Sequence, residues 1–297
     1  MSLLAVLRAT ARPPFLLLTP ACLLLGVATA WRSGAGLGGA QFAWVLLGAL
    51  CAHISVNLLN EYADFRSGLD ASTRRTPFSG GSGALPAQPQ WAAGVLAGGL
   101  LALGVTVAIG LYLVSLRGWP LLVIGLAGVL LVAFYTPWIT RRPLLCLLAP
   151  GLGVGPLMVV GTHLALGGKG WGAALAASWV PACLGSALLL LNQFPDVEAD
   201  RAVGRRNLVI VRGRAWAARL VLVLHGLAAG GVLLAVTLGG LPVGALWGLV
   251  PMVLVLPLGR RLSGPALQTE RLLPAMRLNV AVTLTAPLAL AAGIAWA

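Results

Sequence analysis

Charged residues are scarce in this chain, and acidic residues are the scarcest of them. Only 9% of the 297 residues are Asp, Glu, Lys or Arg and 59% are hydrophobic, whereas a soluble domain is typically about 25% charged. This composition excludes an ordinary soluble globular protein. Seven acidic residues stand against 20 Lys and Arg, which gives a net charge of +13. Because acids are so few, the position of each one is informative.

Cysteine and histidine are also too few and too scattered to form a metal-binding motif. The four cysteines lie in or beside apolar runs with no Cys-x-x-Cys pair, which excludes a thiolate metal site. The three histidines show no mutual spacing typical of ligands. A basic balance often indicates nucleic-acid binding, but here the arginines are dispersed between apolar runs. We therefore expect no nucleic-acid partner, and a chain embedded in the lipid bilayer.

Long apolar runs are what the sequence has instead. A membrane-spanning helix needs about 20 mainly apolar residues, and nine such runs are present. The predicted fold class is all-α, a multi-pass integral membrane bundle of about nine transmembrane helices that forms a single domain over residues 1–297. The predicted helices cover residues 13–31, 41–62, 91–115, 119–136, 143–166, 171–194, 215–238, 241–258 and 272–296.

Basic residues gather in alternate connections between these helices, which predicts an orientation. Lys and Arg accumulate on the cytoplasmic side of a membrane. With a cytoplasmic N-terminus, only Arg32, Arg117 and Lys169 lie outside, and the other 17 of the 20 basic residues lie inside. We expect a protein of a bacterial-type inner or plasma membrane, with its C-terminus outside. Two long cytoplasmic loops, after the second and sixth helices, are expected to cap the bundle.

Six of the seven acids fall in two short clusters, one at the cytoplasmic end of the second helix and one at that of the sixth. The first cluster holds Asn60, Glu61, Asp64 and Asp70, and the second holds Asn192, Asp196, Glu198 and Asp200. Residues four apart share a helix face, so Asn60 and Asp64 point the same way. The Asn-polar-aromatic-x-Asp pattern occurs in both clusters, 132 residues apart, which indicates a pseudo-repeat.

Two carboxylate stripes that face each other repel unless a cation lies between them. Carboxylate and amide oxygens select a hard ion such as Mg²⁺, which completes its shell with water and phosphate oxygens. The clusters therefore predict a metal-bridged diphosphate. The simplest alternative is polar helix ends that meet solvent, but it does not explain why acids are nearly absent elsewhere. A cation transporter with paired acidic stripes is another alternative, yet the outer halves of the predicted helices hold no acid.

These motifs resemble those of the UbiA superfamily of intramembrane prenyltransferases. The resemblance rests on Asn60-Glu61-x-x-Asp64 with Asp70 six residues later, on Asp196-x-x-x-Asp200, on Arg12-Pro13, and on residues 200–208. The six-residue spacing is more similar to the 1,4-dihydroxy-2-naphthoate prenyltransferases of menaquinone synthesis than to the 4-hydroxybenzoate branch. One departure is Glu61, where many members have Asp.

The resemblance implies a polyprenyl diphosphate donor, with its head between the clusters and its tail in an apolar groove, and a small aromatic acceptor. Mg²⁺ would help the donor ionise to an allylic cation, which alkylates a quinone precursor such as 1,4-dihydroxy-2-naphthoate. The acceptors 4-hydroxybenzoate, haem, a chlorophyllide, a lipid or a sugar phosphate stay open.

The resemblance also implies a set of site residues. The candidate catalytic residues are Asn60, Asp64, Asp70, Asp196 and Asp200, and the candidate Mg²⁺ ligands are these five with Glu61. The candidate substrate-binding residues are Arg12, Arg66, Arg75, Tyr135, Arg141, Asn192 and Arg205.

Overall fold

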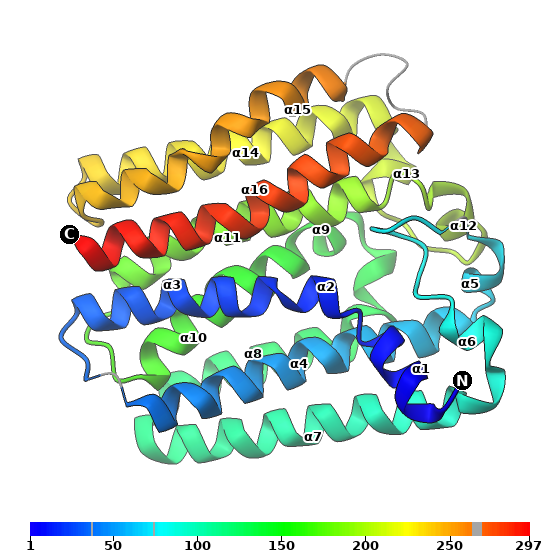
Figure 1. The fold of residues 1–297 in the computed structure, drawn as a ribbon, viewed down its shortest axis with the longest axis horizontal. Coiled ribbons are helices and arrows are strands. Elements are labelled where there is room, and N and C mark those ends of the chain that lie inside the picture. The colour runs from blue at the N-terminus through cyan, green and yellow to red at the C-terminus, as the bar shows by residue number, and fades with distance from the viewer. Residues whose placement is uncertain (37, 74, 263–268) are drawn as a thin grey trace.

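The computed structural model describes residues 1–36, 38–73, 75–262 and 269–297, and the regular elements of these residues are all helical (Figure 1). Eight segments are long and apolar enough to cross a membrane: Pro13–Arg32, Gly39–Arg66, Pro89–Arg117, Pro143–Ala165, Gly172–Asn192, Arg214–Thr237, Val243–Arg261 and Leu272–Trp296. The predicted fourth helix forms as α8 (Trp119–Tyr135), an apolar helix of 17 residues. This length is at the short end of the range of about 17 to 25 residues for a spanning helix. The predicted all-helical membrane bundle is confirmed.

Helices are the expected solution for these apolar runs, because hydrocarbon offers no hydrogen-bond partner and the backbone must satisfy itself within each segment. The other helices of the spanning segments are α2 (Pro13–Leu16) with α3 (Leu18–Arg32), α4 (Gly39–Arg66), α7 (Ala92–Arg117), α9 (Pro143–Leu152) with α10 (Met158–Ala165), α11 (Gly172–Asn192), α14 (Arg214–Thr237), α15 (Val255–Arg261) and α16 (Thr269–Trp296). Along the bundle, α4 packs against α7, α11 against α14, and α16 against α3.

Five short helices gather at one end of the bundle. They are α1 (Leu3–Thr10), α5 (Leu69–Ser72), α6 (Ala84–Ala87), α12 (Val197–Ala202) and α13 (Leu208–Arg212). The N-terminus lies at this end and the C-terminus at the opposite end (Figure 1). Because α5 packs against α12, the loop after α4 and the loop after α11 meet. The structure thus brings both acidic clusters to one mouth of the bundle.

The predicted eighth helix differs from the regular α-helix that its apolar run suggests. Residues 243–254 form two 3₁₀ segments, η4 (Val243–Leu249) and η5 (Pro251–Leu254), and only then does α15 begin. Proline lacks a backbone N–H and interrupts α-helical hydrogen bonding, and Pro251 stands at the start of η5. The η4 backbone also lies close to α16, since a Cβ on Gly244 would be 2.2 Å from the Gly293 carbonyl oxygen.

Candidate active site

The first cluster occupies the end of α4 and the short helix that follows it. Asn60 and Asp64 lie one turn apart, and the Asn60 side-chain amide donates to the Thr136 hydroxyl at 3.2 Å. The chain leaves α4 through Gly68, whose φ of +77° favours glycine. This turn brings Asp70 on α5 back toward the helix, where its side chain is only 3% exposed. Asp70 therefore lines the same cavity as Asn60 and Asp64.

The second cluster begins where α11 ends. Asn192 is the last residue of α11, Asp196 precedes α12, and Asp200 is buried on α12. Asp200 accepts hydrogen bonds at both carboxylate oxygens, from Arg205 Nη1 at 3.0 Å and from Asn207 Nδ2 at 3.0 Å. These bonds close the turn after α12, and Asp200 is held in a fixed orientation.

Arg205 joins the two clusters. Its Nη1 bonds Asp200 of the second cluster, and its Nη2 forms an ion pair with Asp64 of the first. The guanidinium is itself largely buried, with 17% of the side chain exposed. A buried cation between two carboxylates is the arrangement that offsets their repulsion. In this structure the Arg205 guanidinium is the positive charge between the two clusters, and the metal ion expected there stays a prediction.

Several oxygens of the site have no partner. Asp70 Oδ2, Asn192 Oδ1 and Asp196 Oδ1 are buried without a hydrogen bond to any of the residues described by the structure. Burial also raises the pKa of the Asp70, Asp196 and Asp200 carboxyl groups above the usual range, because the charged form loses its solvent. Unpartnered buried acceptors need an explanation, and a bound cation supplies one.

The donor set fits Mg²⁺ in its chemistry. The free atoms are carboxylate and amide oxygens, the ligands that a hard divalent ion takes. Across the described part of the chain, no three His, Cys, Asp or Glu side chains converge closely enough to hold an ion alone. Since Mg²⁺ is usually bound through one or two carboxylates together with substrate phosphates, an incomplete protein shell is consistent with an ion shared with a diphosphate.

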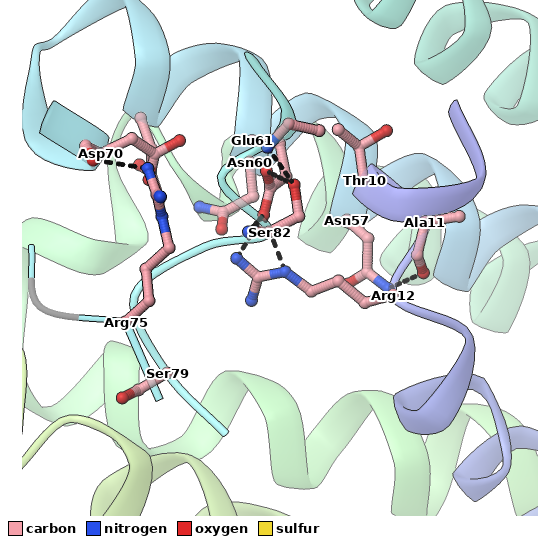
Figure 2. Close-up of polar contacts among 12 residues, drawn as sticks. Thr10, Ala11, Arg12, Asn57, Asn60, Glu61, Asp70, Arg75, Ser79 and Ser82 are labelled. Atoms are coloured by element: carbon pink, nitrogen blue, oxygen red, sulfur yellow. Dashed lines mark hydrogen bonds and ion pairs between the residues drawn. The ribbon is translucent and has the colours of Figure 1, made fainter. Parts of the chain in front are cut away.

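Glu61, a predicted metal ligand, contacts other groups (Figure 2). Its Oε1 accepts from Arg12 Nε at 2.8 Å and from the Ser82 backbone N–H at 2.8 Å. Its Oε2 accepts from the Ser82 hydroxyl at 2.7 Å. Glu61 is fully buried. It links Arg12, at the junction of α1 and α2, to Ser82 in the loop between α5 and α6.

The predicted arginines fall into two groups. Arg12 and Arg205 line the cavity described below, and Arg75 donates to the Asp70 carbonyl oxygen at 3.4 Å. Arg66, Arg75 and Arg141 are exposed, outside the lining of the cavity. The sequence alone does not separate the two groups, because all five arginines lie at the end of the bundle that carries the acidic clusters. Glu198 is exposed as well and pairs with Arg201 at 3.3 Å.

A cavity of about 470 Å³ runs inward from the two clusters. Its polar end is lined by Asn60, Asp64, Asp70, Asn192, Asp196, Asp200, Arg12, Arg205 and Tyr135. Its remaining wall is mostly apolar and comes from α3, α4, α7, α8, α10 and α11. The lining reaches Leu113 and Leu121, which flank the Gly118 turn between α7 and α8 at the far end of these helices. The cavity therefore has a charged end, hereafter the head compartment, and a long apolar remainder, hereafter the tail compartment.

Three residues of this site were not predicted from the sequence. Thr136 bonds Asn60, Ser82 bonds Glu61, and Asn207 bonds Asp200. Asn207 lies in the segment that carried the family resemblance, and Ser82 lies in a Gly-Ser run that also suggests a flexible linker. Neutral hydroxyl and amide groups stand out little in a sequence, because their partners are distant along the chain.

Comparison with known proteins identifies the family. The sequence profile of the UbiA prenyltransferase family matches residues 17–271. The chain belongs to the UbiA prenyltransferase family. It is 28% identical over 186 residues to the 1,4-dihydroxy-2-naphthoate octaprenyltransferase of Bacillus subtilis (strain 168), which covers 61% of this chain and 57% of that enzyme. The chain thus spans little more than half the length of this UbiA relative.

Solved structures share the UbiA fold at low sequence identity. A digeranylgeranylglyceryl phosphate synthase matches with a TM-score of 0.69 at 15% identity, covering 100% of both chains. A UbiA homologue from Archaeoglobus fulgidus bound to GPP and Mg²⁺ matches with a TM-score of 0.66 at 14% identity, covering 97% of this chain and 99% of that one. The predicted UbiA-like membrane fold is confirmed.

Proposed function

We propose that the protein is a Mg²⁺-dependent prenyltransferase that moves a polyprenyl group from a polyprenyl diphosphate to an aromatic quinone precursor. The observation that carries this proposal is the cavity, in which two carboxylate clusters and two arginines form one end and apolar helix faces form the rest. A polyprenyl diphosphate has the same division, with an anionic head and a long hydrocarbon tail. The A. fulgidus homologue, bound to GPP and Mg²⁺, supports this assignment by analogy of fold.

The site residues have distinct tasks in this reaction. Asn60, Asp64, Asp70, Asp196 and Asp200 would hold Mg²⁺, which acts as a Lewis acid on the leaving diphosphate. Arg205 and Arg12 would bind the diphosphate oxygens, since a guanidinium fork matches phosphate geometry. The apolar wall excludes water, which would otherwise quench the allylic cation.

Tyr135 and Asn192 lie where the head compartment meets the tail compartment. The Tyr135 ring stabilises positive charge at the reacting carbon through its negative face. Asn192 presents its free Oδ1 to the head group or its metal. Both residues are therefore assigned to substrate binding, as the sequence predicts.

We propose 1,4-dihydroxy-2-naphthoate as the acceptor, which places the enzyme in menaquinone synthesis. Two observations support it, namely the six-residue spacing from Asp64 to Asp70 and the similarity to the B. subtilis naphthoate enzyme. The reaction would take place at the cytoplasmic face of a bacterial-type inner membrane, where the basic residues gather.

The test is incubation of purified protein and Mg²⁺ with a polyprenyl diphosphate and a panel of acceptors, scored by product mass. We expect prenylated naphthoate, and no product when EDTA removes the metal. Asp64→Ala and Asp196→Ala should each abolish transfer while the protein stays folded in membranes. Glu198→Ala is the matched control, because Glu198 is exposed and its carboxylate is 78% accessible.

Two outcomes would contradict the proposal. Full activity of Asp64→Ala or Asp196→Ala overturns the metal assignment. A lack of product with every acceptor, combined with metal uptake into vesicles, favours a cation transporter instead. Prenylation of 4-hydroxybenzoate but not of naphthoate keeps the reaction class and overturns the acceptor.

A further inference from the structure

Three separate segments meet at the Glu61 carboxylate (Figure 2). Glu61 comes from α4, Arg12 from the junction of α1 and α2, and Ser82 from the loop between α5 and α6. Four hydrogen bonds join them: two from the Arg12 guanidinium, one from the Ser82 backbone and one from the Ser82 hydroxyl. Three of these bonds end on Oε1 and one on Oε2, so both oxygens of the carboxylate, which has about four acceptor positions, are engaged by groups of the protein.

The orientation of Glu61 also separates it from the metal-binding face. Glu61 follows Asn60 directly, and consecutive residues on a helix point about 100° apart. Asn60 and Asp64 line the cavity, whereas Glu61 is absent from its described lining. A metal ion at Glu61 would compete with Arg12 and Ser82 for the oxygens of a fully buried carboxylate. Unpairing buried charged groups in this way is strongly unfavourable.

Both partners of Glu61 belong to segments that line the head compartment. Arg12 has a φ of +52°, a left-handed conformation that is unfavourable for a residue other than glycine and must be held by its surroundings. In this conformation Arg12 lines the cavity while two of its nitrogens bond Glu61. The ion pair therefore holds the strained junction in the geometry that aims Arg12 at the site.

The loop that carries Ser82 contacts both acidic clusters. The Gly80 N–H lies close enough to the Asp196 carboxylate to oppose the rise of its pKa, and Gly81 lies directly against Asp70, since a Cβ on Gly81 would be 2.6 Å from Asp70 Oδ1. Gly81 adopts a φ of +73°, so its freedom of conformation is needed here. Residues 76–83, hereafter the cap loop, thus lie over the head compartment, and Ser82 is where the loop is attached to α4.

We propose that Glu61 is a positioning residue and not a metal ligand: it aims Arg12 at the diphosphate and fastens the cap loop over the head compartment. This inference rests on the proposed function for its catalytic consequence. The attachment of the cap loop by Glu61 is a property of the protein with or without turnover, so the two claims are tested by different measurements.

The first measurement is limited trypsin cleavage after Arg75, at the base of the cap loop, in detergent-solubilised protein without substrate. Glu61→Gln should release the loop and raise the cleavage rate about tenfold or more, as expected for loss of a hydrogen bond to a charged group. Ser82→Ala, which removes the hydroxyl bond and keeps the backbone bond, should change the rate in the same direction but less. Cleavage after Arg212, in the other cap region, serves as the internal reference.

The second measurement separates positioning from metal binding. For Glu61→Gln we expect the KM for polyprenyl diphosphate to rise about tenfold or more, with the Mg²⁺ concentration for half-maximal rate unchanged within about twofold. Asp196→Asn, the comparison variant, should shift the Mg²⁺ dependence. The double variant Arg12→Glu with Glu61→Arg, which restores an ion pair, should recover trypsin resistance relative to either single change.

The opposite pattern would overturn the inference. If Glu61→Gln shifts the Mg²⁺ dependence as Asp196→Asn does while trypsin resistance stays that of the wild type, Glu61 is a metal ligand. If the wild type transfers no prenyl group, the proposed function fails, and the trypsin series alone still decides whether Glu61 fastens the cap loop. Folding of each variant is checked by its elution as a monodisperse species in detergent.

Discussion

Arg205 is the side chain on which the two acidic clusters converge. It contacts Asp64 on α4 and Asp200 on α12, although 141 residues separate Arg205 from Asp64. A buried carboxylate is costly unless it is paired, and here one guanidinium serves two of them. Its neighbour Arg206 is exposed, and the Arg206 backbone N–H donates a hydrogen bond to the Thr140 carbonyl oxygen at 3.2 Å. Adjacent arginines therefore have different roles.

Replacing Arg205 should destabilise the protein most strongly when metal is absent. Arg205→Gln leaves Asp64 and Asp200 without their shared cation, and we expect the free energy of unfolding to fall by about 3–5 kcal/mol, as when one partner of a buried ion pair is removed. Mg²⁺ should restore more stability to this variant than to the wild type, because the ion replaces the lost charge. The measurement is thermal unfolding in detergent with EDTA or with Mg²⁺.

The matched control is Arg206→Gln, for which a change within about 0.5 kcal/mol is expected of a surface substitution. Equal melting temperatures for the two variants would show that Arg205 contributes no more to the stability of the fold than the exposed Arg206.

Among the helices, α8 lines the tail compartment with one of its faces. Residues Leu121, Ile124, Gly125, Gly128, Val132 and Tyr135 line the cavity, at the three- and four-residue spacing of one helix face. An added Cβ on Gly128 would meet no atom within 4 Å. Gly128 precedes Tyr135 by seven residues, which is about 10 Å along the helix. The glycine therefore keeps the cavity wide at that depth.

Filling the cavity at Gly128 should select against long donors. Gly128→Leu is expected to lower kcat/KM for a donor of many isoprene units by about tenfold or more relative to GPP, a typical effect of changed apolar fit in a pocket. The ratio of the two rates, measured by product mass in competition, reports the effect. Gly104→Leu is the control, because an added Cβ at Gly104 also meets no atom within 4 Å but this residue lies outside the cavity lining. An unchanged ratio in Gly128→Leu would show that the tail does not pass α8.

At the scale of the whole molecule, the two termini lie at opposite ends of the bundle, and the short capping helices lie at the end of the N-terminus (Figure 1). The distribution of basic residues predicts that this end is cytoplasmic. Every candidate metal ligand lies at the same end. An enzyme in this orientation takes both substrates from the cytoplasmic side.

The orientation is tested with single cysteines at the two ends. In a variant lacking Cys22, Cys51, Cys146 and Cys183, we introduce Ser2→Cys or Ala297→Cys and add a membrane-impermeant maleimide. Ser2→Cys should react in inside-out vesicles and Ala297→Cys in right-side-out vesicles. Reaction of both variants in the same vesicles would contradict an odd number of membrane crossings.

The helical bundle, the position of most spans and the presence of both acidic clusters at one end could be predicted from the amino-acid sequence. These features depend on local properties: apolar runs of spanning length and the repeat of the helix, which sets Asn60 and Asp64 on one face. Residues 243–254 form 3₁₀ segments and not the expected α-helix. The hydropathy of this run does not predict that form, because it contains no information on how closely η4 packs against α16.

The pairing of the charged groups, by contrast, depends on how the helices and loops pack in three dimensions. Arg12 reaches Glu61 across 49 residues and Arg205 reaches Asp64 across 141, and no local pattern encodes such pairs. Among five candidate arginines, two line the cavity and three are exposed, since packing and not composition sets the direction of each side chain. Glu61 has the charge of a metal ligand, but both of its carboxylate oxygens already accept hydrogen bonds from two other segments.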